Sequence, residues 1–73
     1  MISIWTYDPK TGKDLYLVDE IIIASLWRRA FDYGWQIDFQ DHRIDGKTVK
    51  YDDAKFIIET IVGYIVTGSV HAS

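Results

Sequence analysis

Apolar residues recur at helical spacing in two parts of the chain, the first being residues 20–33. Asp19 before this segment is a suitable N-cap, and Gly34 after it is a residue type that commonly follows a helix. On a helical wheel the apolar positions share one face, and they are Ile22, Ile23, Leu26, Ala30 and Tyr33. The pattern therefore predicts an amphipathic helix over residues 20–33.

The second segment with this spacing is residues 54–67. Asp52 or Asp53 can cap its start, and Gly68 can close its end. Its apolar stripe consists of Ile57, Ile58, Ile61, Val62 and Ile65. Because β-branched residues are weak helix formers, packing against the rest of the protein has to stabilise this second predicted helix.

Alternating apolar and polar residues predict a hairpin between the helices, from residues 35–43 and 47–51 around Asp45-Gly46. A three-residue loop over residues 44–46, with Gly46 at positive φ, is the register that separates an apolar from a polar face. The predicted apolar face is Ile37, Phe39, Val49 and Tyr51. The polar face is Gln36, Asp38, Gln40, Thr48 and Lys50.

A first hairpin is predicted from residues 2–7 and 13–18, which flank a turn containing Pro9 and Gly12. A three-residue loop over residues 10–12 would pair Trp5 with Leu17. One face would then carry Trp5, Tyr7, Leu15 and Leu17, and the other Ile2, Ile4, Tyr16 and Val18. Both faces are apolar, so one of them stays exposed when the other packs on the helices.

The two halves of the chain, residues 1–34 and 35–68, match at an offset of 34 residues. Identical residues fall at the loop glycines, the helix caps and one core position, and the pairs are Gly12 and Gly46, Lys13 and Lys47, Asp19 and Asp53, Ile23 and Ile57, and Gly34 and Gly68. This repeat predicts a single α+β domain over residues 1–73. We expect a two-layer sandwich of order ββαββα, a four-stranded antiparallel sheet with both helices on one face, and a tail at residues 69–73.

The size of the chain bears on association and on location. A domain of 73 residues buries only about 60–65% of its unfolded surface, so its stability is marginal unless it associates. The chain has no cysteine, which suits a reducing compartment. The start of the chain lacks the pattern of a signal peptide, and the apolar stretch 56–70 contains Glu59 and is too short to span a bilayer. We therefore expect a cytoplasmic protein with no membrane partner.

Candidate catalytic and metal-binding residues are few. His42 lies near the predicted hairpin tip and His71 in the tail, and the serines have no motif around them. Asp38, Asp41, His42 and Asp45 form an acidic group, but alternation along a strand sends Asp38 and Asp41 to opposite faces. We therefore expect no enzyme activity, no catalytic residue, no metal and no cofactor.

The charge balance disfavours nucleic acid as a partner. Acidic residues outnumber basic ones by 11 to 8, for a net charge of −3, whereas phosphate neutralisation supplies most of the affinity for such ligands. Trp27, Arg28 and Arg29 nevertheless keep one alternative open, a single-stranded nucleic-acid binder that uses aromatic residues of its sheet. A small-ligand binder at a dimer interface is a further alternative.

Leftover apolar surface points instead to protein contact. The candidate interface residues on the first hairpin are Ile2, Ile4, Tyr16 and Val18, and Phe56, Thr60 and Gly63 form a second stripe on the polar side of the second helix. The sequence therefore predicts a small non-enzymatic module that binds a protein partner, associates with itself as a homodimer, or does both. Its size and composition are those of phage- and mobile-element-encoded inhibitors of host protein machines.

Overall fold

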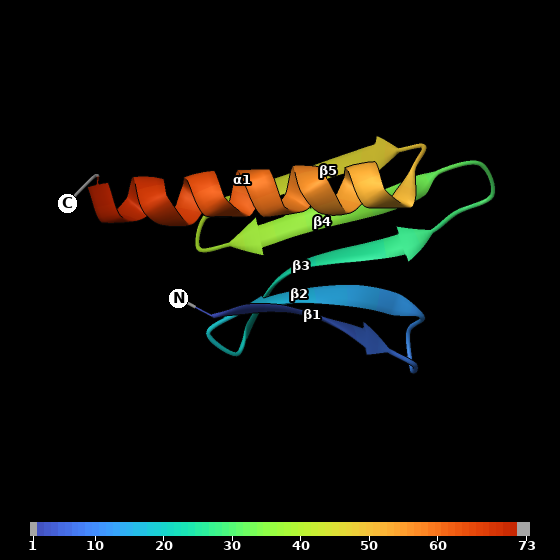
Figure 1. Cartoon of the computed structure of the whole chain (residues 1–73), viewed down its shortest axis with the longest axis horizontal. Coiled ribbons are helices and arrows are strands. Elements are labelled where there is room, and N and C mark those ends of the chain that lie inside the picture. Colours follow the sequence, from blue (N-terminus) through green and yellow to red (C-terminus); the bar gives the residue numbers. More distant parts are fainter. Residues whose placement is uncertain (1, 72–73) are drawn as a thin grey trace.

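A computed structural model describes the backbone of residues 2–71 and the side chains of residues 2–66. The elements are β1 (Ser3–Asp8), β2 (Lys13–Val18), β3 (Ile21–Arg28), β4 (Tyr33–Phe39), β5 (His42–Thr48) and α1 (Tyr51–His71). The strands form one five-stranded antiparallel sheet in the order of the chain. The helix lies on one face of this sheet and packs against β3, β4 and β5, leaving β1 and β2 to one side (Figure 1).

The predicted ββαββα fold is wrong, because the protein has five strands and one helix instead of four strands and two helices. It is still a small α+β fold. The two halves do not repeat each other, since Ile23 lies in β3 whereas Ile57, its counterpart at the 34-residue offset, lies in α1. Of the predicted tail, residues 69–71 belong to α1, and residues 72–73 lie outside the described part of the chain.

The helix predicted over residues 20–33 is β3 and the start of β4. Asp19 does not cap a helix: Asp19 and Glu20 have φ angles of 51° and 71° and form a two-residue hairpin turn of the type that follows the twist of the strands. Asp19 fixes this turn, because its N–H donates to the carbonyl of Ile2 (2.8 Å) and its Oδ1 accepts from the N–H of Ile2 (2.9 Å).

A β-bulge in β3 explains the helix-like spacing of its apolar residues. Tyr16 lies opposite Ala24 and Leu17 opposite Ile22, so Ile23 is the extra residue between them. Ile23 and Ala24 are consecutive and both buried. This breaks the period of two that marks a half-buried strand.

The second hairpin turns at Gln40 and Asp41 and not at residues 44–46, so the predicted loop is wrong. Asp45 and Gly46 lie inside β5, and a Cβ atom at Gly46 would overlap the indole ring of Trp35 on the neighbouring strand. Ile37 and Phe39 face α1 and Gln36 and Asp38 face away, as predicted, but Val49 and Tyr51 lie outside the sheet.

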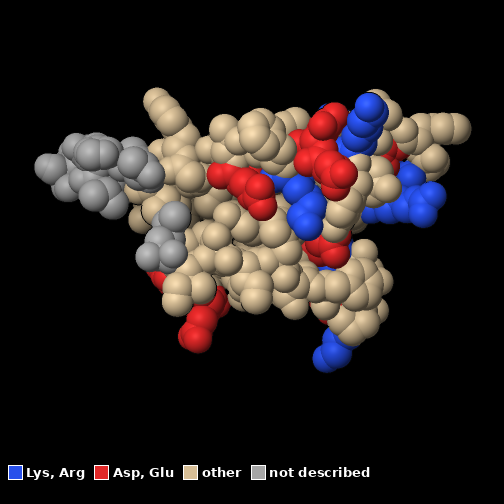
Figure 2. Space-filling view, in the orientation of Figure 1, with Lys and Arg blue, Asp and Glu red and all other residues tan. Residues whose placement is uncertain are grey.

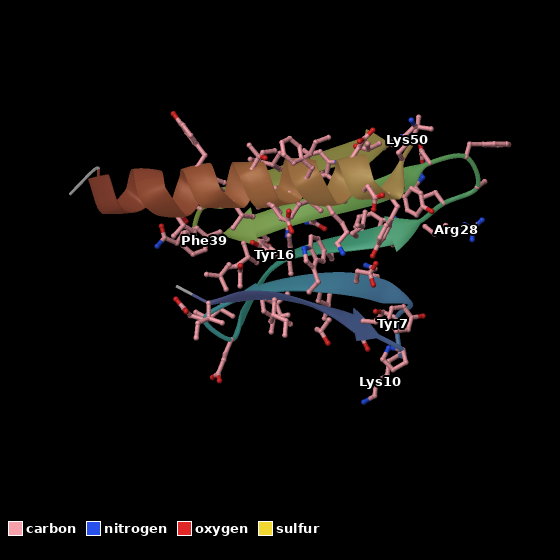
Figure 3. The ribbon with its side chains drawn as sticks, in the orientation of Figure 1. Tyr7, Lys10, Tyr16, Arg28, Phe39 and Lys50 are labelled. Atoms are coloured by element: carbon pink, nitrogen blue, oxygen red, sulfur yellow. The ribbon has the colours of Figure 1, made fainter. Side chains whose placement is uncertain are left out.

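The first hairpin is confirmed, but its register differs by one residue from the prediction. Trp5 lies opposite Tyr16, and the turn has four residues, with Gly12 at a φ of 74°. Asp8 holds this longer turn: its carbonyl accepts from Gly12 N–H (2.8 Å), and its carboxylate accepts from Lys10 N–H (3.1 Å) and Thr11 Oγ1 (2.9 Å). The turn, with Lys10 and Tyr7, lies at one end of the molecule (Figure 3).

The second predicted helix is confirmed as α1, although it begins three residues earlier than expected, at Tyr51, and continues through Gly68, its predicted end, to His71. Asp52 and Asp53 lie in its first turn, where acidic side chains favour the helix dipole. The residues of α1 that are completely or almost completely buried are spaced four apart and are Ala54, Ile58 and Val62. They pack with Tyr16, Leu26, Trp35 and Ile37 to form the core between helix and sheet. None of the helices within residues 2–71 has the length and apolar character needed to cross a membrane.

Candidate interaction surface

The sheet has one face covered by α1 and a second face on which no described helix or strand packs. We call this second face the open face. Alternation along the strands places on it Ile4, Thr6, Asp8, Lys13, Leu15, Leu17, Ile22, Ser25, Trp27, Gln36, Asp38, Arg43, Asp45 and Lys47. The side chains from β1 to β3 are mainly apolar, and those from β4 and β5 are polar or charged.

The apolar half of the open face lies on β1, β2 and the start of β3. Ile4 and Ile22 are 59% and 57% exposed, and Leu15 and Leu17 between them are half-buried by their neighbours. Leu17 lies directly opposite Ile4 on one side and Ile22 on the other, so the three form a row across three strands. A cluster of adjacent apolar side chains on three strands is the kind of surface that marks a contact site.

Trp27 extends the apolar half toward β4. Its indole ring lies over Gly34, where an added Cβ would come within 2.7 Å of the ring. The ring therefore lies flat on the backbone of β4, in a position that only glycine permits. The Lys13 ammonium lies 4.8 Å from the ring centroid, so a cation covers part of the exposed aromatic surface.

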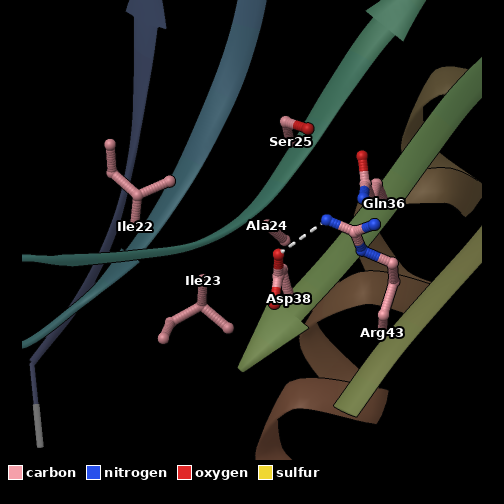
Figure 4. A pocket seen from close by; sticks show the side chains of 7 residues that line it. All are labelled: Ile22, Ile23, Ala24, Ser25, Gln36, Asp38 and Arg43. Carbon is pink, nitrogen blue, oxygen red and sulfur yellow. Dashed lines mark hydrogen bonds and ion pairs between the residues drawn. The ribbon is translucent and has the colours of Figure 1, made fainter. Parts of the chain in front are cut away.

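The polar half of the open face carries equal numbers of each charge, from Asp38, Arg43, Asp45 and Lys47. Arg43 reaches across from β5 to Asp38 on β4, with 3.3 Å between Nη2 and Oδ2. Beside this pair is a shallow pocket of about 320 Å³, lined also by Ile22, Ser25 and Gln36 (Figure 4). An ion pair this exposed contributes little to stability, so both charges stay accessible to a partner.

Two of the predicted interface residues on the first hairpin are exposed and two are not. Ile4 is on the open face, and Ile2, at 75% exposure, precedes β1. Tyr16 and Val18 are buried on the face that α1 covers, and the ring of Tyr16 packs 4.8 Å from that of Trp5. The predicted grouping of these residues on one face is therefore wrong. The cause is the register, because a shift of one residue exchanges the faces of a strand.

The predicted stripe on the second helix lies on the outer side of α1, away from the open face. Phe56 is 68% exposed, Thr60 is exposed, and an added Cβ at Gly63 would meet no atom within 4 Å. This side of the helix is free of other described elements. It is separated from the open face by the whole sheet, so the two surfaces cannot form one site.

Sequence reasoning missed four apolar residues of the open face, namely Leu15, Leu17, Ile22 and Trp27. Leu15 and Leu17 were expected on the face of Trp5, and Ile22 and Trp27 were assigned to a helix. One signal for the strand was the run of three isoleucines at residues 21–23, since β-branched residues favour strands.

The hydroxyl of Tyr51 links the start of α1 to β2. It donates a hydrogen bond of 2.5 Å to Asp14 Oδ2, and its ring packs 5.4 Å from that of Tyr33. This hydrogen bond, together with partial burial, raises the pKa of Tyr51 to about 12. The phenol therefore stays protonated at neutral pH. It acts as a structural donor and cannot serve as a base.

The acidic group around His42 does not converge. Asp38 and Asp45 lie on the open face, whereas His42 lies on the face that α1 covers. Among the described residues, no three His, Cys, Asp or Glu side chains are placed to hold a metal ion. The side chain of His71 lies outside the described part.

Comparisons of the chain with protein-family models, with curated proteins and with solved structures find no match. Its function is therefore inferred from its own residues and their arrangement.

Proposed function

We propose that the protein is a non-enzymatic binding module that contacts a partner protein through its open face. The observation that carries this proposal is the row of Ile4, Leu17 and Ile22, which no described element covers. Burying such a row removes apolar area from water, at roughly 25 cal/mol per Å². Among residues 2–71, no helix or strand packs on this row.

The charges beside the row indicate what kind of partner fits. Protein interfaces combine an apolar centre with a polar, hydrated rim, and the open face has its apolar residues on β1 to β3 and its charges on β4 and β5. These charges are balanced, with Asp38 and Asp45 against Arg43 and Lys47. The partner we infer is therefore a protein surface with an apolar centre and a rim of both signs.

The open face supports the nucleic-acid alternative less well. Single-stranded binders use several aromatic rings in a basic groove, but Trp27 is the one aromatic residue on this face, and Lys13 already lies over its ring. Balanced charges also give no electrostatic attraction to phosphate. Action as an inhibitor of a host machine and cytoplasmic location stay predictions, based on size, composition and the absence of cysteine.

Two adjacent isoleucines provide a matched test. Ile21 and Ile22 are 60% and 57% exposed, yet Ile22 is on the open face and Ile21 on the other. We expect Ile22→Glu to reduce the amount of partner captured from native host extract by about tenfold or more, and Ile21→Glu to leave it unchanged. Capture would be quantified by mass spectrometry on immobilised wild-type and variant protein. Equal retention or equal loss in the two variants would contradict a role for the open face.

A further inference from the structure

The sheet has two free edges, because neither β1 nor β5 has a second strand beside it among the described residues. The outer side of an edge strand presents unpaired backbone N–H and C=O groups that can pair with another chain. Natural edges are commonly protected by charged side chains. The two edges of this sheet differ in that respect.

The hydrogen bonds of β1 identify the backbone groups that point outward. At one end the carbonyl of Ile2 accepts from Asp19 N–H, and at the other the carbonyl of Asp8 accepts from Gly12 N–H, each at 2.8 Å. Residues that bond to the neighbouring strand alternate with residues that do not. The backbones of Ser3, Trp5 and Tyr7 therefore point away from β2, with three N–H and three C=O groups unpaired.

The outward backbone groups of β5 can be identified from a hydrogen bond between the residues that join β3 and β4. Arg29 N–H donates to the carbonyl of Asp32 (2.8 Å), which fixes the alternation of β3 with β4 and, through β4, that of β5. The outward residues of β5 are then Arg43, Asp45 and Lys47, all of them charged. None of the residues from Ser3 to Tyr7 is charged, and the surface over β1 is tan along most of its length (Figure 2).

Pairing with a second copy distinguishes the edges further. In an antiparallel pair of β1 strands centred on Trp5, the two Trp5 residues lie opposite each other and Ser3 lies opposite Tyr7 of the partner subunit. All outward groups of both strands are then paired, and no charge faces another. Sliding by two residues leaves at least one outward residue without a strand partner.

The equivalent register of β5 is unfavourable. It would place Asp45 opposite Asp45 of the partner subunit and Arg43 opposite Lys47 of the partner subunit, and like charges directly opposite each other destabilise a sheet. The charges of β5 therefore oppose the one register that pairs all of its outward groups, whereas the uncharged β1 allows the equivalent register.

We propose that β1 pairs with β1 of a second copy, in antiparallel register centred on Trp5, and joins two five-stranded sheets into one. The edge of the sheet forms this contact and the open face does not, so the inference stands apart from the proposed function. The twofold axis would bring the Ile4 and Thr6 side chains of both copies side by side. Two open faces would then form one continuous surface.

The test uses proline at outward positions of β1. Proline lacks an N–H but is tolerated on an edge strand where that group faces outward. We expect the wild type to show twice the 8.5 kDa mass of one chain in light scattering and sedimentation equilibrium. The double variant Ser3→Pro and Tyr7→Pro should show the mass of one chain while keeping its far-ultraviolet circular dichroism.

Two controls separate this edge from the other surfaces. Asp45→Pro removes one outward N–H from β5, and Ile22→Glu changes the open face. Both should leave the doubled mass intact, whatever Ile22→Glu does to partner capture. A monomeric wild type would overturn the proposal, as would a dimer that survives in the β1 double variant or is lost in Asp45→Pro.

A measurement on the unaltered protein covers the case in which the proline variant fails to fold. Amide exchange followed by nuclear magnetic resonance should show protection at Ser3, Trp5 and Tyr7 that falls on dilution. The amide of Thr6, which bonds within the hairpin, should keep its protection. Fast exchange at all three outward amides at the highest concentration would contradict the pairing.

Discussion

Two tryptophans of this sheet lie over glycines of neighbouring strands, one on each face. Trp35 lies over Gly46 beneath α1, and Trp27 lies over Gly34 on the open face. Trp35 is buried, and its Nε1 donates to Thr48 Oγ1 (2.9 Å). Trp27 is half-buried, has no described helix over it, and has the Lys13 ammonium 4.8 Å from its ring centroid. The same cross-strand contact thus serves as core on one face and as surface on the other.

The difference indicates what α1 contributes. A ring held between helix and sheet cannot move without displacing other core residues, whereas a ring on an uncovered face can turn into solvent. We therefore expect equivalent substitutions to cost more on the covered face than on the open face, and the following predictions test this in order of expected size.

The largest difference is expected between Ile58→Ala and Leu17→Ala. Ile58 is completely buried between α1 and the sheet, so its truncation leaves a cavity that costs about 3 kcal/mol of unfolding free energy. Leu17 is half-buried on the open face, and its truncation should cost about 1 kcal/mol. Urea unfolding followed by circular dichroism measures both values. Equal costs would mean that the open face is packed as tightly as the core.

The two glycines give the next largest difference. A Cβ at Gly46 overlaps a buried indole, so Gly46→Ala should lower the unfolding free energy by about 2 kcal/mol through overpacking. Gly34→Ala displaces a ring that can swing outward, and should cost roughly 1 kcal/mol or less. The fluorescence of Trp27 should also shift to longer wavelength in Gly34→Ala. A larger cost at Gly34 than at Gly46 would contradict the difference between the two faces.

The smallest effect is expected for Tyr51→Phe, which removes the hydrogen bond to Asp14 and should cost about 1 kcal/mol. The pKa of Tyr51 rises from 10.0 to about 12 on folding, so the protonated phenol stabilises the folded state. This contribution is full below pH 10 and is lost as the pH rises through about 12. The stability difference between wild type and Tyr51→Phe should therefore disappear over that range. Tyr64→Phe, at an 81% exposed position, is the control and should leave the unfolding free energy unchanged, because it removes no described hydrogen bond.

The parts of the fold that could be predicted from the sequence are those in which local pattern and tertiary packing agree. The stripe at Ile58 and Val62 predicted a helix, and α1 buries that stripe. Gly12 predicted a turn, and the turn uses it at positive φ. In β4 the alternation of Gln36, Ile37 and Asp38 predicted the faces of the strand correctly.

The failures have physical causes at single residues. Glu20 adopts a positive φ, which is uncommon for glutamate, and the bulge at Ile23 hides the period of β3. Asp45-Gly46 is a strong hairpin signal, but Gly46 is required inside β5 to make room for Trp35. The open face was missed for a related reason. Which residues lie on it depends on the register of the strands, and the local sequence did not determine that register.

The order of the strands has a consequence for how the protein folds. Each strand pairs with the strand next to it in the chain, so the sheet can assemble one hairpin after another with short loop closures, and a topology of this kind folds fast. The helix that covers one side follows the whole sheet in sequence. During synthesis both faces of the nascent sheet therefore expose apolar side chains until residues 51–71 leave the ribosome. In that interval the chain is most exposed to aggregation.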